Sequence, residues 1–184
     1  MSILAIALLA ATGTSEAKDR PVSDHTQSVT IAPFKLIEPR AHIEYERSLS
    51  DKTGFTVGAV YGNWNGLLLR IFNALSDEDF TRTNMGVNAA YNYHFKHFNR
   101  GWFVSGGMNI DNISATLGDD DAGSYTTLQL GPTLGYKVAG EGGFTFAFDF
   151  GYGYQAVLAE SDDSLMSTPG SSAYMGSTSM GWSF

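Results

Sequence analysis

The stretch F-T-F-A-F-D-F-G-Y-G-Y, residues 144–154, decides the fold of this chain. Every even-numbered position in it is aromatic, and every odd-numbered position is small or polar. Successive side chains of a strand point to opposite faces, so the pattern predicts a strand with one aromatic face, whereas a helix would scatter the rings around its axis. That face must be buried in a protein core or in lipid, and the rest of the chain has to distinguish the two.

The composition favours a β-barrel over an average soluble domain. Of 184 residues, 21 are glycine, 13% are aromatic and only 16% are charged, whereas a typical domain is about 25% charged. Mean hydropathy is -0.11 and no run of 18 apolar residues occurs, so we expect no transmembrane helix. Sparse charge, abundant glycine and alternating aromatic residues are typical of membrane barrels.

Charge and cysteine content exclude several other classes of function. The net charge of -8 comes without any cluster of lysine or arginine, which argues against nucleic-acid binding. The absence of cysteine excludes disulfides, cysteine-based metal sites and a lipid-anchored N-terminal cysteine. The glycines match no phosphate-binding loop, so we expect no cofactor.

The N-terminus has the pattern of a secretory signal peptide. Residues 3–11 form a short apolar block, and Ser15-Glu16-Ala17 follows as a small-x-small cleavage site, although no basic residue precedes the block. We therefore expect residues 1–17 to be a signal peptide, 18–28 a flexible lead-in, and 29–184 a barrel domain. An N-terminal core helix is the alternative for the first segment.

Alternating segments recur along the whole chain. They are predicted at 29–37, 40–49, 55–64, 84–95, 102–113, 124–138, 144–156 and 173–184. Pro39 separates the first two, because proline lacks the N–H that a strand ladder needs. Counting them as two gives eight strands, and counting them as one gives seven. Pro132 predicts a bulge within its strand.

The predicted connections alternate in length. Residues 50–54, 96–100 and 139–143 form short turns, whereas 65–83, 114–123 and 157–172 are long. Short periplasmic turns and long extracellular loops are typical of outer-membrane barrels, whose tilted strands need about 9–11 residues to cross the bilayer. An even strand number also brings both termini to the side of the short turns. We therefore predict an all-β, eight-stranded, antiparallel up-and-down transmembrane β-barrel.

The face opposite the aromatic residues favours lipid outside the barrel. It carries mainly asparagine, threonine, serine, glycine and glutamine with a few charges, as expected for a narrow polar lumen. A soluble barrel such as a lipocalin would instead need a charged exterior.

In this pattern the chain resembles the small outer-membrane β-barrels of Gram-negative bacteria, of the OmpA/OmpX type. The resemblance rests on R-A-H-I-E-Y-E-R-S-L-S at 40–50, L-G-P-T-L-G-Y at 130–136, the aromatic repeat at 146–154 and the terminal M-G-W-S-F. It implies a bacterial outer-membrane location and outer-membrane lipid around the strands. It also implies recognition by the outer-membrane assembly machinery through Phe184, Trp182 and Met180.

The charged positions on the lumen face are the candidate site residues, namely Arg40, His42, Glu44, Glu46, Lys137 and Asp149. A proton or ligand site is one interpretation of this group. We favour an internal ion-pair network, with Lys137 and Asp149 as partners across the lumen, because buried charges require partners.

Catalytic and metal sites have weaker support. A lipid-modifying enzyme would need a nucleophilic serine beside a histidine, and His25, His42, His94 and His97 are the available histidines. No G-x-S-x-G motif occurs, and His97 falls in a predicted periplasmic turn. Asp119-Asp120-Asp121 has no calcium-loop spacing and predicts a solvated acidic loop.

The sequence thus predicts a non-enzymatic envelope barrel with a lumen filled by side chains. Extracellular partners would bind through the loops 65–83, 114–123 and 157–172. The alternatives are an enzyme that acts on lipid A or phospholipid, and a soluble lipocalin-like binder of small ligands.

Overall fold

Eight antiparallel strands form the molecule. The computed structural model describes residues 25–32, 40–64, 80–117, 120–161 and 171–184, and none of these residues is helical. The strands are β1 (Gln27–Ile31), β2 (Arg40–Ser48), β3 (Thr53–Trp64), β4 (Phe80–His94), β5 (Arg100–Leu117), β6 (Asp120–Ala139), β7 (Phe144–Glu160) and β8 (Ser172–Ser183).

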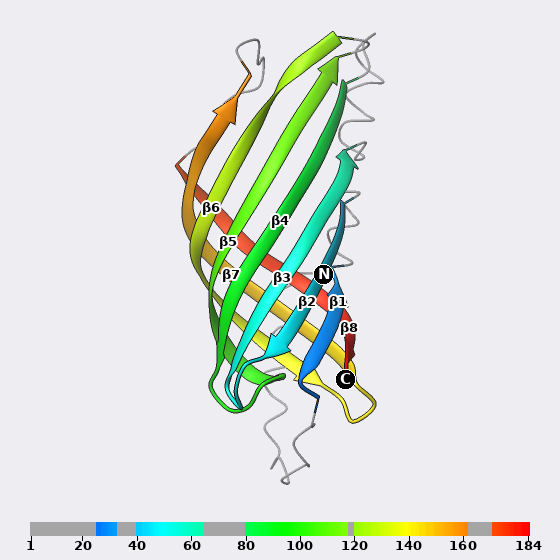
Figure 1. Ribbon diagram of the computed structural model, residues 1–184, viewed down its shortest axis with the longest axis vertical. Helices are drawn as coiled ribbons and strands as arrows, with labels where there is room; N and C mark the ends of the chain where they lie inside the picture. The colour runs from blue at the N-terminus through cyan, green and yellow to red at the C-terminus, as the bar shows by residue number, and fades with distance from the viewer. Residues whose placement is uncertain (1–24, 33–39, 65–79, 118–119, 162–170) are drawn as a thin grey trace, which may run out of the picture.

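Each strand pairs with the next strand in the sequence, and β8 pairs with β1 to close the ring. The result is a closed up-and-down barrel whose strands are inclined to its long axis (Figure 1). The predicted barrel and its eight strands are confirmed, and counting the segments on either side of Pro39 as two strands was correct. Pro39 itself lies outside the described residues.

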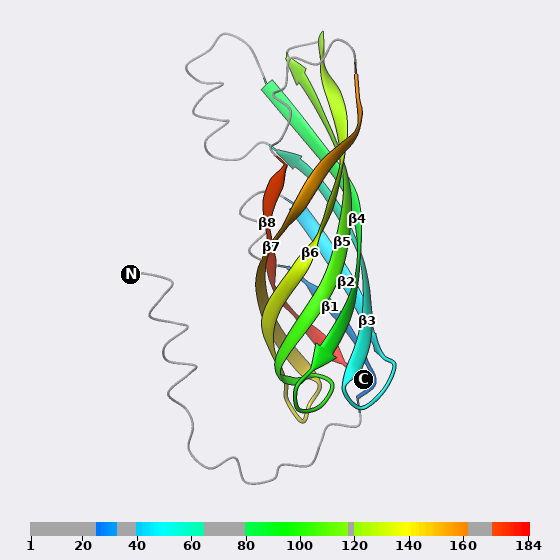
Figure 2. The ribbon, with the colours of Figure 1, turned by 90° about the vertical axis from the view of Figure 1, so that its left-hand side faces the viewer.

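The two ends of the barrel differ. One end, called the turn end here, holds the short connections 49–52, 95–99 and 140–143. The start of β1 and the end of β8 meet there, since the Gln27 amide donates to the Phe184 carbonyl at 3.0 Å. The opposite end is called the loop end. Towards it β4, β5, β6 and β7 extend beyond the other strands, so that one side of the wall is taller (Figures 1 and 2).

Strand lengths differ from the prediction on this tall side. β5, β6 and β7 have 18, 20 and 17 residues. The predicted loop 114–123 was wrong, because Ser114 pairs with Ser124 and Leu117 pairs with Asp120, which leaves only residues 118–119 outside the hairpin. Consecutive aspartates favour turns, but here two of them continue the ladder through a register shift at Ala115/Thr116.

The first strand is shorter than predicted and begins earlier. β1 covers Gln27–Ile31, so it includes two residues of the expected lead-in. Residues 33–39 lie outside the described residues, as do the whole expected signal peptide and most of the lead-in.

Pro132 does not produce the bulge that was predicted there. It lies opposite Gly106 in β5. On the β7 side the described pairs run from Leu130 with Tyr154 to Thr133 with Gly151, which keeps one register across the proline. The register shift between β6 and β7 lies at Thr126/Thr127 instead.

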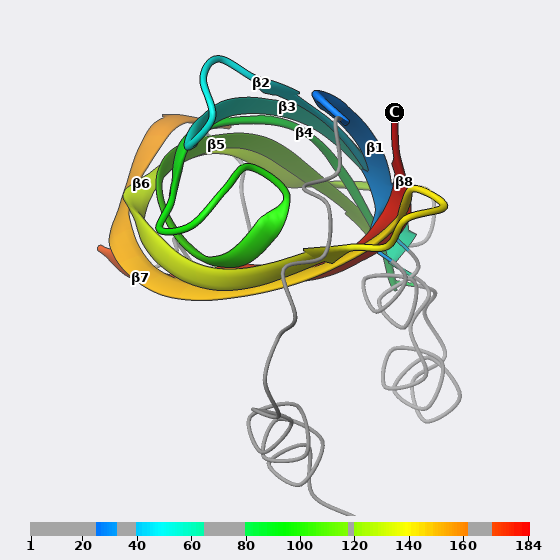
Figure 3. The same cartoon turned by 90° about the horizontal axis from the view of Figure 1, so that it is seen from below.

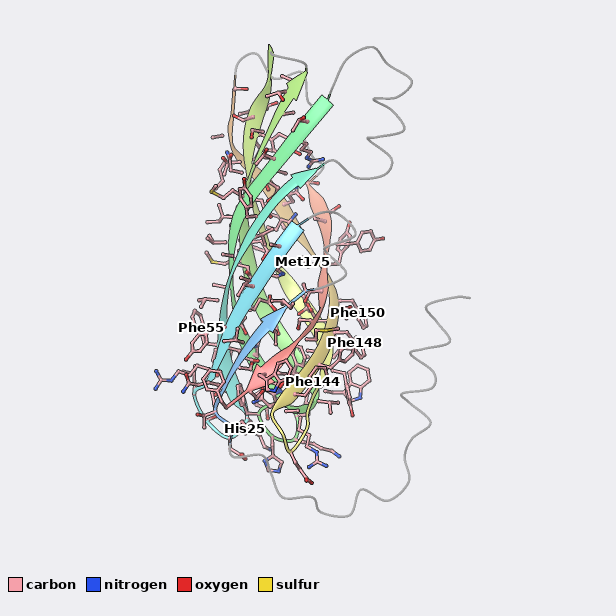
Figure 4. The ribbon with its side chains drawn as sticks, turned by 90° about the vertical axis from the view of Figure 1, so that its right-hand side faces the viewer. His25, Phe55, Phe144, Phe148, Phe150 and Met175 are labelled. Carbon is pink, nitrogen blue, oxygen red and sulfur yellow. The ribbon has the colours of Figure 1, made fainter. Side chains whose placement is uncertain are left out.

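The aromatic face of residues 144–154 lies on the outside of the barrel. Figure 4 shows Phe144, Phe148 and Phe150 on the outer surface, with Phe55 on the outer surface of another strand. Phe150 is 58% exposed and Tyr154 is 60% exposed. Charged residues are scarce on the outer surface. The outward positions of the strands carry one charge, Arg47, within the ranges 29–31, 43–47, 55–61, 85–93, 102–112, 126–138, 144–154 and 174–182.

The interior is polar. Its fully buried side chains include His94, Asn99, Thr127, Thr145 and Ser28. Inward glycines bring the wall close together, as where β6, β7 and β8 meet at Gly131, Gly153 and Met175. The barrel is therefore apolar outside and polar inside, the reverse of a soluble globular domain.

We predict that Gly181→Ala destabilises the β1–β8 closure. A Cβ at Gly181 would overlap the Val29 carbonyl oxygen and the Thr30 backbone, neither of which can rotate away. We expect a loss of about 1–3 kcal/mol in the free energy of unfolding, measured by urea titration of the folded barrel followed by tryptophan fluorescence.

Gly106→Ala is the matched control, because a Cβ at Gly106 meets no atom within 4 Å. Equal unfolding midpoints for the two variants would show that the seam is not packed as described.

Candidate functional site

Strand alternation brings the candidate residues into the interior. His42, Glu44 and Glu46 occupy successive inward positions of β2, Lys137 comes from β6 and Asp149 from β7. β2 and β6 are separated by three strands along the ring, so contacts between them cross the lumen.

The strongest of these contacts joins Lys137 and Glu46. Lys137 Nζ forms an ion pair with Glu46 Oε2, and both residues are buried. Lys137 also donates to Ser28 Oγ at 3.0 Å, and Glu46 Oε1 accepts from Asn92 Nδ2 at 2.7 Å. Because a buried charge is costly unless it is both paired and hydrogen-bonded, these neutral partners help to make the pair tolerable inside the barrel.

Aromatic rings surround the ion pair at the turn end. His94 is fully buried and has ring neighbours Phe98 and Phe103, each with its centroid 5.3 Å away. His94 Nε2 lies 3.5 Å from Glu46 Oε1, and Lys137 Nζ lies 5.4 Å from the centre of the Phe98 ring. The ring contact adds a cation–π interaction to the ion pair.

The turn between β4 and β5 folds inward and covers this end of the lumen. Figure 3, seen from below, shows the connection curling across the mouth of the ring. Asn99 has a φ of 64°, a left-handed conformation that asparagine tolerates better than most residues. The Phe98 amide donates to the Asp51 carbonyl at 2.7 Å, and Asn99 Nδ2 donates to the His25 carbonyl at 3.3 Å. We call residues 95–99 the end cap.

Towards the loop end the interior becomes hollow. A cavity of about 120 Å³ lies beside Glu46 and Lys137, and a second of about 530 Å³ lies further up; both are lined by His42, Asn88 and Asp149. The two cavities share these walls. The interior is thus filled at the turn end but not throughout.

Hydrogen bonds order the polar walls of this space. His42 Nε2 lies 3.2 Å from Asn88 Oδ1 and 3.3 Å from Glu44 Oε1, and Asn88 Nδ2 donates to Glu44 Oε1 at 3.1 Å. Asp149 Oδ1 accepts from both the Ser177 amide at 3.0 Å and the Ser177 hydroxyl at 2.7 Å. These contacts hold the carboxylates of β2 and β7 in defined positions.

The structure brings Lys137 to Glu46 across the lumen, as the sequence suggested, whereas the hydrogen bonds described for Asp149 are with the adjacent strand. Arg40 lies in β2 opposite Gly62 of β3. Sequence reasoning missed Ser28, Asn92 and Phe98 as members of the buried cluster. Phe98 was assigned to a plain turn; its signal was a large apolar residue within an otherwise polar five-residue connection.

The three residues of the expected assembly signal lie along β8 and just beyond it. Trp182 and Phe184 are exposed on the outer surface, and Trp182 packs edge-on against Phe144 with ring centres 5.5 Å apart. Met180 pairs with Ile31 of β1. These side chains therefore lie beside the seam that closes the barrel.

In the contacts described above, histidine rings lie beside carboxylates, an amide and aromatic rings. In addition, His97 Nδ1 lies 3.0 Å from Asp51 Oδ1. None of these contacts supplies a serine hydroxyl to a histidine. Within the described ranges, no group of three histidine, aspartate or glutamate side chains is arranged to hold a metal ion. Asp120 and Asp121 lie in β6, and Asp119 is outside those ranges.

In the part of the chain that the structure describes, no helix is long and apolar enough to cross a membrane. No protein-family model, curated protein or solved structure matches the chain.

We predict that Lys137→Met strongly destabilises the barrel. It leaves the Glu46 carboxylate buried without its ammonium partner, and breaking such a pair from one side costs about 3–5 kcal/mol. The double variant Lys137→Met/Glu46→Gln should recover most of that loss, since the amide keeps an oxygen acceptor for Asn92 without a charge. The measurement is urea unfolding of the single and double variants.

Lys96→Met serves as the control, because Lys96 is an exposed lysine at the same end of the barrel. A double variant as unstable as Lys137→Met would show that lost packing, and not an isolated charge, explains the effect.

Proposed function

We propose that this protein is a non-enzymatic outer-membrane barrel of a Gram-negative bacterium, related in type to the OmpA/OmpX barrels. The observation that carries the proposal is the outer surface, where aromatic and aliphatic side chains are exposed and charge is almost absent. Val57, Val87 and Leu130, with 40%, 56% and 43% exposure, belong to this surface. Soluble monomers rarely expose apolar patches larger than a few hundred Å², so a belt around the whole barrel favours contact with hydrocarbon.

The height of the apolar belt supports the same proposal. On β7 it extends over the 11 residues from Phe144 to Tyr154, and a tilted strand needs about 9–11 residues to cross a bilayer. Trp102 and Tyr136 pack together near the turn end, and Tyr152 packs on Tyr174 nearer the loop end, with ring centres 5.3 Å apart in both pairs. Aromatic residues are enriched at the two interfaces of a membrane, where their rings meet headgroups.

In this arrangement the turn end faces the periplasm and the loop end faces outward. The expected signal peptide at 1–17 would direct export, and Phe184, Trp182 and Met180 would present the C-terminal strand to the assembly machinery. The upper parts of β5 and β6 would stand above the membrane, together with the segments 65–83 and 157–172. Contacts with an extracellular partner or a role in envelope integrity would belong to this surface.

The filled turn end argues against a permanently open pore. The lumen there is occupied by the end cap, by His94 with its ring neighbour Phe103, and by the Lys137–Glu46 pair. Eight strands enclose only enough space for side chains or one small ligand. The scaffold is therefore proposed as a closed barrel with its exposed surfaces at the loop end.

Cell fractionation tests the location. The protein should sediment with the outer membrane, require detergent for extraction, and migrate differently on a gel when it is not boiled. Recovery in the aqueous fraction would overturn the proposal in favour of a soluble barrel.

A depth-dependent pair of substitutions tests whether hydrocarbon surrounds the strands. Phe150 lies near the middle of the apolar belt of β7, and Leu158 is an exposed outward residue nearer the loop end. Phe150→Arg should weaken folding into phosphatidylcholine vesicles by about 2–4 kcal/mol, and Leu158→Arg by about 1 kcal/mol or less. Equal effects at the two positions would contradict a bilayer around residues 144–154.

The filled turn end predicts the electrical behaviour. The wild-type barrel in a planar bilayer should show no steady conductance. Phe98→Ala combined with Lys137→Ala and Glu46→Gln should produce measurable ion flux, because it removes one ring of the end cap and the ammonium beneath it without leaving the Glu46 carboxylate buried and unpaired. Steady wild-type channels would contradict the proposed closure, and Lys96→Ala controls for loss of a lysine at this end.

A further inference from the structure

A group of aromatic rings lies on the outer surface of β4–β7 near the turn end. Tyr93 packs edge-on against Phe95 with ring centres 5.9 Å apart. Trp102 packs against Tyr136 and Phe148, with ring centres 5.3 and 6.2 Å away, and Figure 4 labels Phe148. The Phe95 amide donates to the Trp102 carbonyl at 3.0 Å, so these two residues are opposite each other in the β4–β5 hairpin. We call these five residues the turn-end aromatic group.

Two basic residues lie on the turn side of this group, where β5 begins. Arg100 pairs with Val138, whose side chain is exposed on the outer surface, so Arg100 occupies an outward position next to that of Trp102. Lys96 is exposed, and its Cδ lies 3.9 Å from the position that a Cβ on Gly101 would take. Both cations are therefore beside the first residues of β5.

Lys52 adds a third cation from the neighbouring turn. Its side chain is exposed, and its carbonyl accepts from the His94 amide at 2.7 Å, at the end of β4. The Phe98 amide donates to the Asp51 carbonyl at 2.7 Å, which holds the turn 49–52 against the end cap. We call the three cations the basic border, namely Lys52, Lys96 and Arg100.

The basic border is a net positive surface. None of the ion pairs among the described residues includes one of its members. Asp51 is the one carboxylate in the turns 49–52 and 95–99, and its Oδ1 lies 3.0 Å from His97 Nδ1. Arg47, exposed on β2, adds a further cation on the same side of the barrel. Residues 18–24 contain two basic and two acidic residues, so their sequence does not change this balance.

This positive charge is local. The whole chain has a net charge of -8, and the turn between β6 and β7 carries an exposed carboxylate, Glu141. Trp182 and Phe144 form another aromatic pair beside that turn, since a Cβ on Gly143 would lie 3.4 Å from the Trp182 ring. Because the net charge repels anionic molecules, we expect an anion to bind only where cations are gathered.

From this arrangement we infer that the basic border and the turn-end aromatic group bind an anionic phospholipid of the periplasmic leaflet. Its phosphate would lie against Lys52, Lys96 and Arg100, whose N–H groups donate charge-assisted hydrogen bonds. Its acyl chains would lie over the rings, which bury apolar area. The rings beside the cations favour a phospholipid over a free phosphate. The inference rests on the proposed membrane location, because only a bilayer supplies such a leaflet.

Quenching of single tryptophans by brominated lipids tests the inference. The full barrel with Trp64→Phe/Trp182→Phe keeps Trp102 in the aromatic group, and the matched barrel with Trp64→Phe/Trp102→Phe keeps Trp182 near Glu141. Each is folded into phosphatidylcholine vesicles with a small fraction of phosphatidylglycerol, and either lipid carries the bromine. One basic side chain attracts an anionic lipid by a factor of about five, so we expect at least about fivefold enrichment of phosphatidylglycerol at Trp102 and none at Trp182.

Charge variants separate a local site from general electrostatic attraction. Lys52→Gln/Lys96→Gln/Arg100→Gln should abolish the enrichment at Trp102 and leave quenching by brominated phosphatidylcholine unchanged. Adding Glu141→Lys to this triple variant returns positive charge to the turn between β6 and β7, and it should not restore the enrichment at Trp102. The unboiled gel shift verifies that each variant is folded.

The same measurements distinguish failure of the site from failure of the proposed function. If brominated phosphatidylcholine quenches neither tryptophan, hydrocarbon does not surround the barrel and the proposed location is wrong. If it quenches both, the site alone is overturned by equal enrichment at Trp102 and Trp182, by enrichment that persists in the folded triple variant, or by its recovery with Glu141→Lys. Absence of any enrichment also overturns the site and would leave a soluble anion as the candidate for the basic border.

Discussion

Closure of the sheet is the constraint on which the rest of this structure depends. The backbone of β8 pairs with β1 from Met180 to Ser183, and Phe184 and Gln27 exchange amide–carbonyl bonds at the end of that seam. Once the ring is closed, every strand has one face inside and one face outside, and the period of two in the sequence becomes two separate surfaces. The aromatic residues of 144–154 lie outside because the interior of eight strands is too narrow for six rings on one strand. The polar and small residues are therefore on the inside, and their hydrogen bonds must be made across the lumen.

The side chains of the interior make contacts across the lumen at the turn end, but mainly along the wall further up. At the turn end, Lys137 and Glu46 pair across the lumen, with Ser28 and Asn92 as neutral partners and the rings of Phe98 and Phe103 nearby. Pairing offsets the desolvation of both charges, so the cluster can be buried, and it links β1, β2, β4 and β6 around one point. Above it the side chains are too short to fill the cross-section. Asn88, Ser177 and Asp149 hydrogen-bond to their neighbours on the wall, and two cavities remain.

The strands that form the wall also differ in length. β5, β6 and β7 are longer than a bilayer requires, whereas β1 has five residues. Among the described strands, the upper half of β8 pairs with β7 alone, because β1 pairs with β8 only over Met180–Ser183. The differences in strand length also make one side of the wall taller than the other (Figure 2).

The alternation of residues determined the strand number, the faces of each strand and the inward position of His42, Glu44, Glu46, Lys137 and Asp149, because side-chain direction in a strand is a local property. Other features depended on tertiary structure. That Lys137 meets Glu46 follows from ring closure and register, which place β6 opposite β2. That the predicted loop 114–123 is mostly strand follows from cross-strand pairing, which overrides the turn preference of consecutive aspartates. Phe98 folds into the lumen only because closure creates a mouth for the end cap to cover, and the cavities exist only because strands that are distant in sequence enclose them.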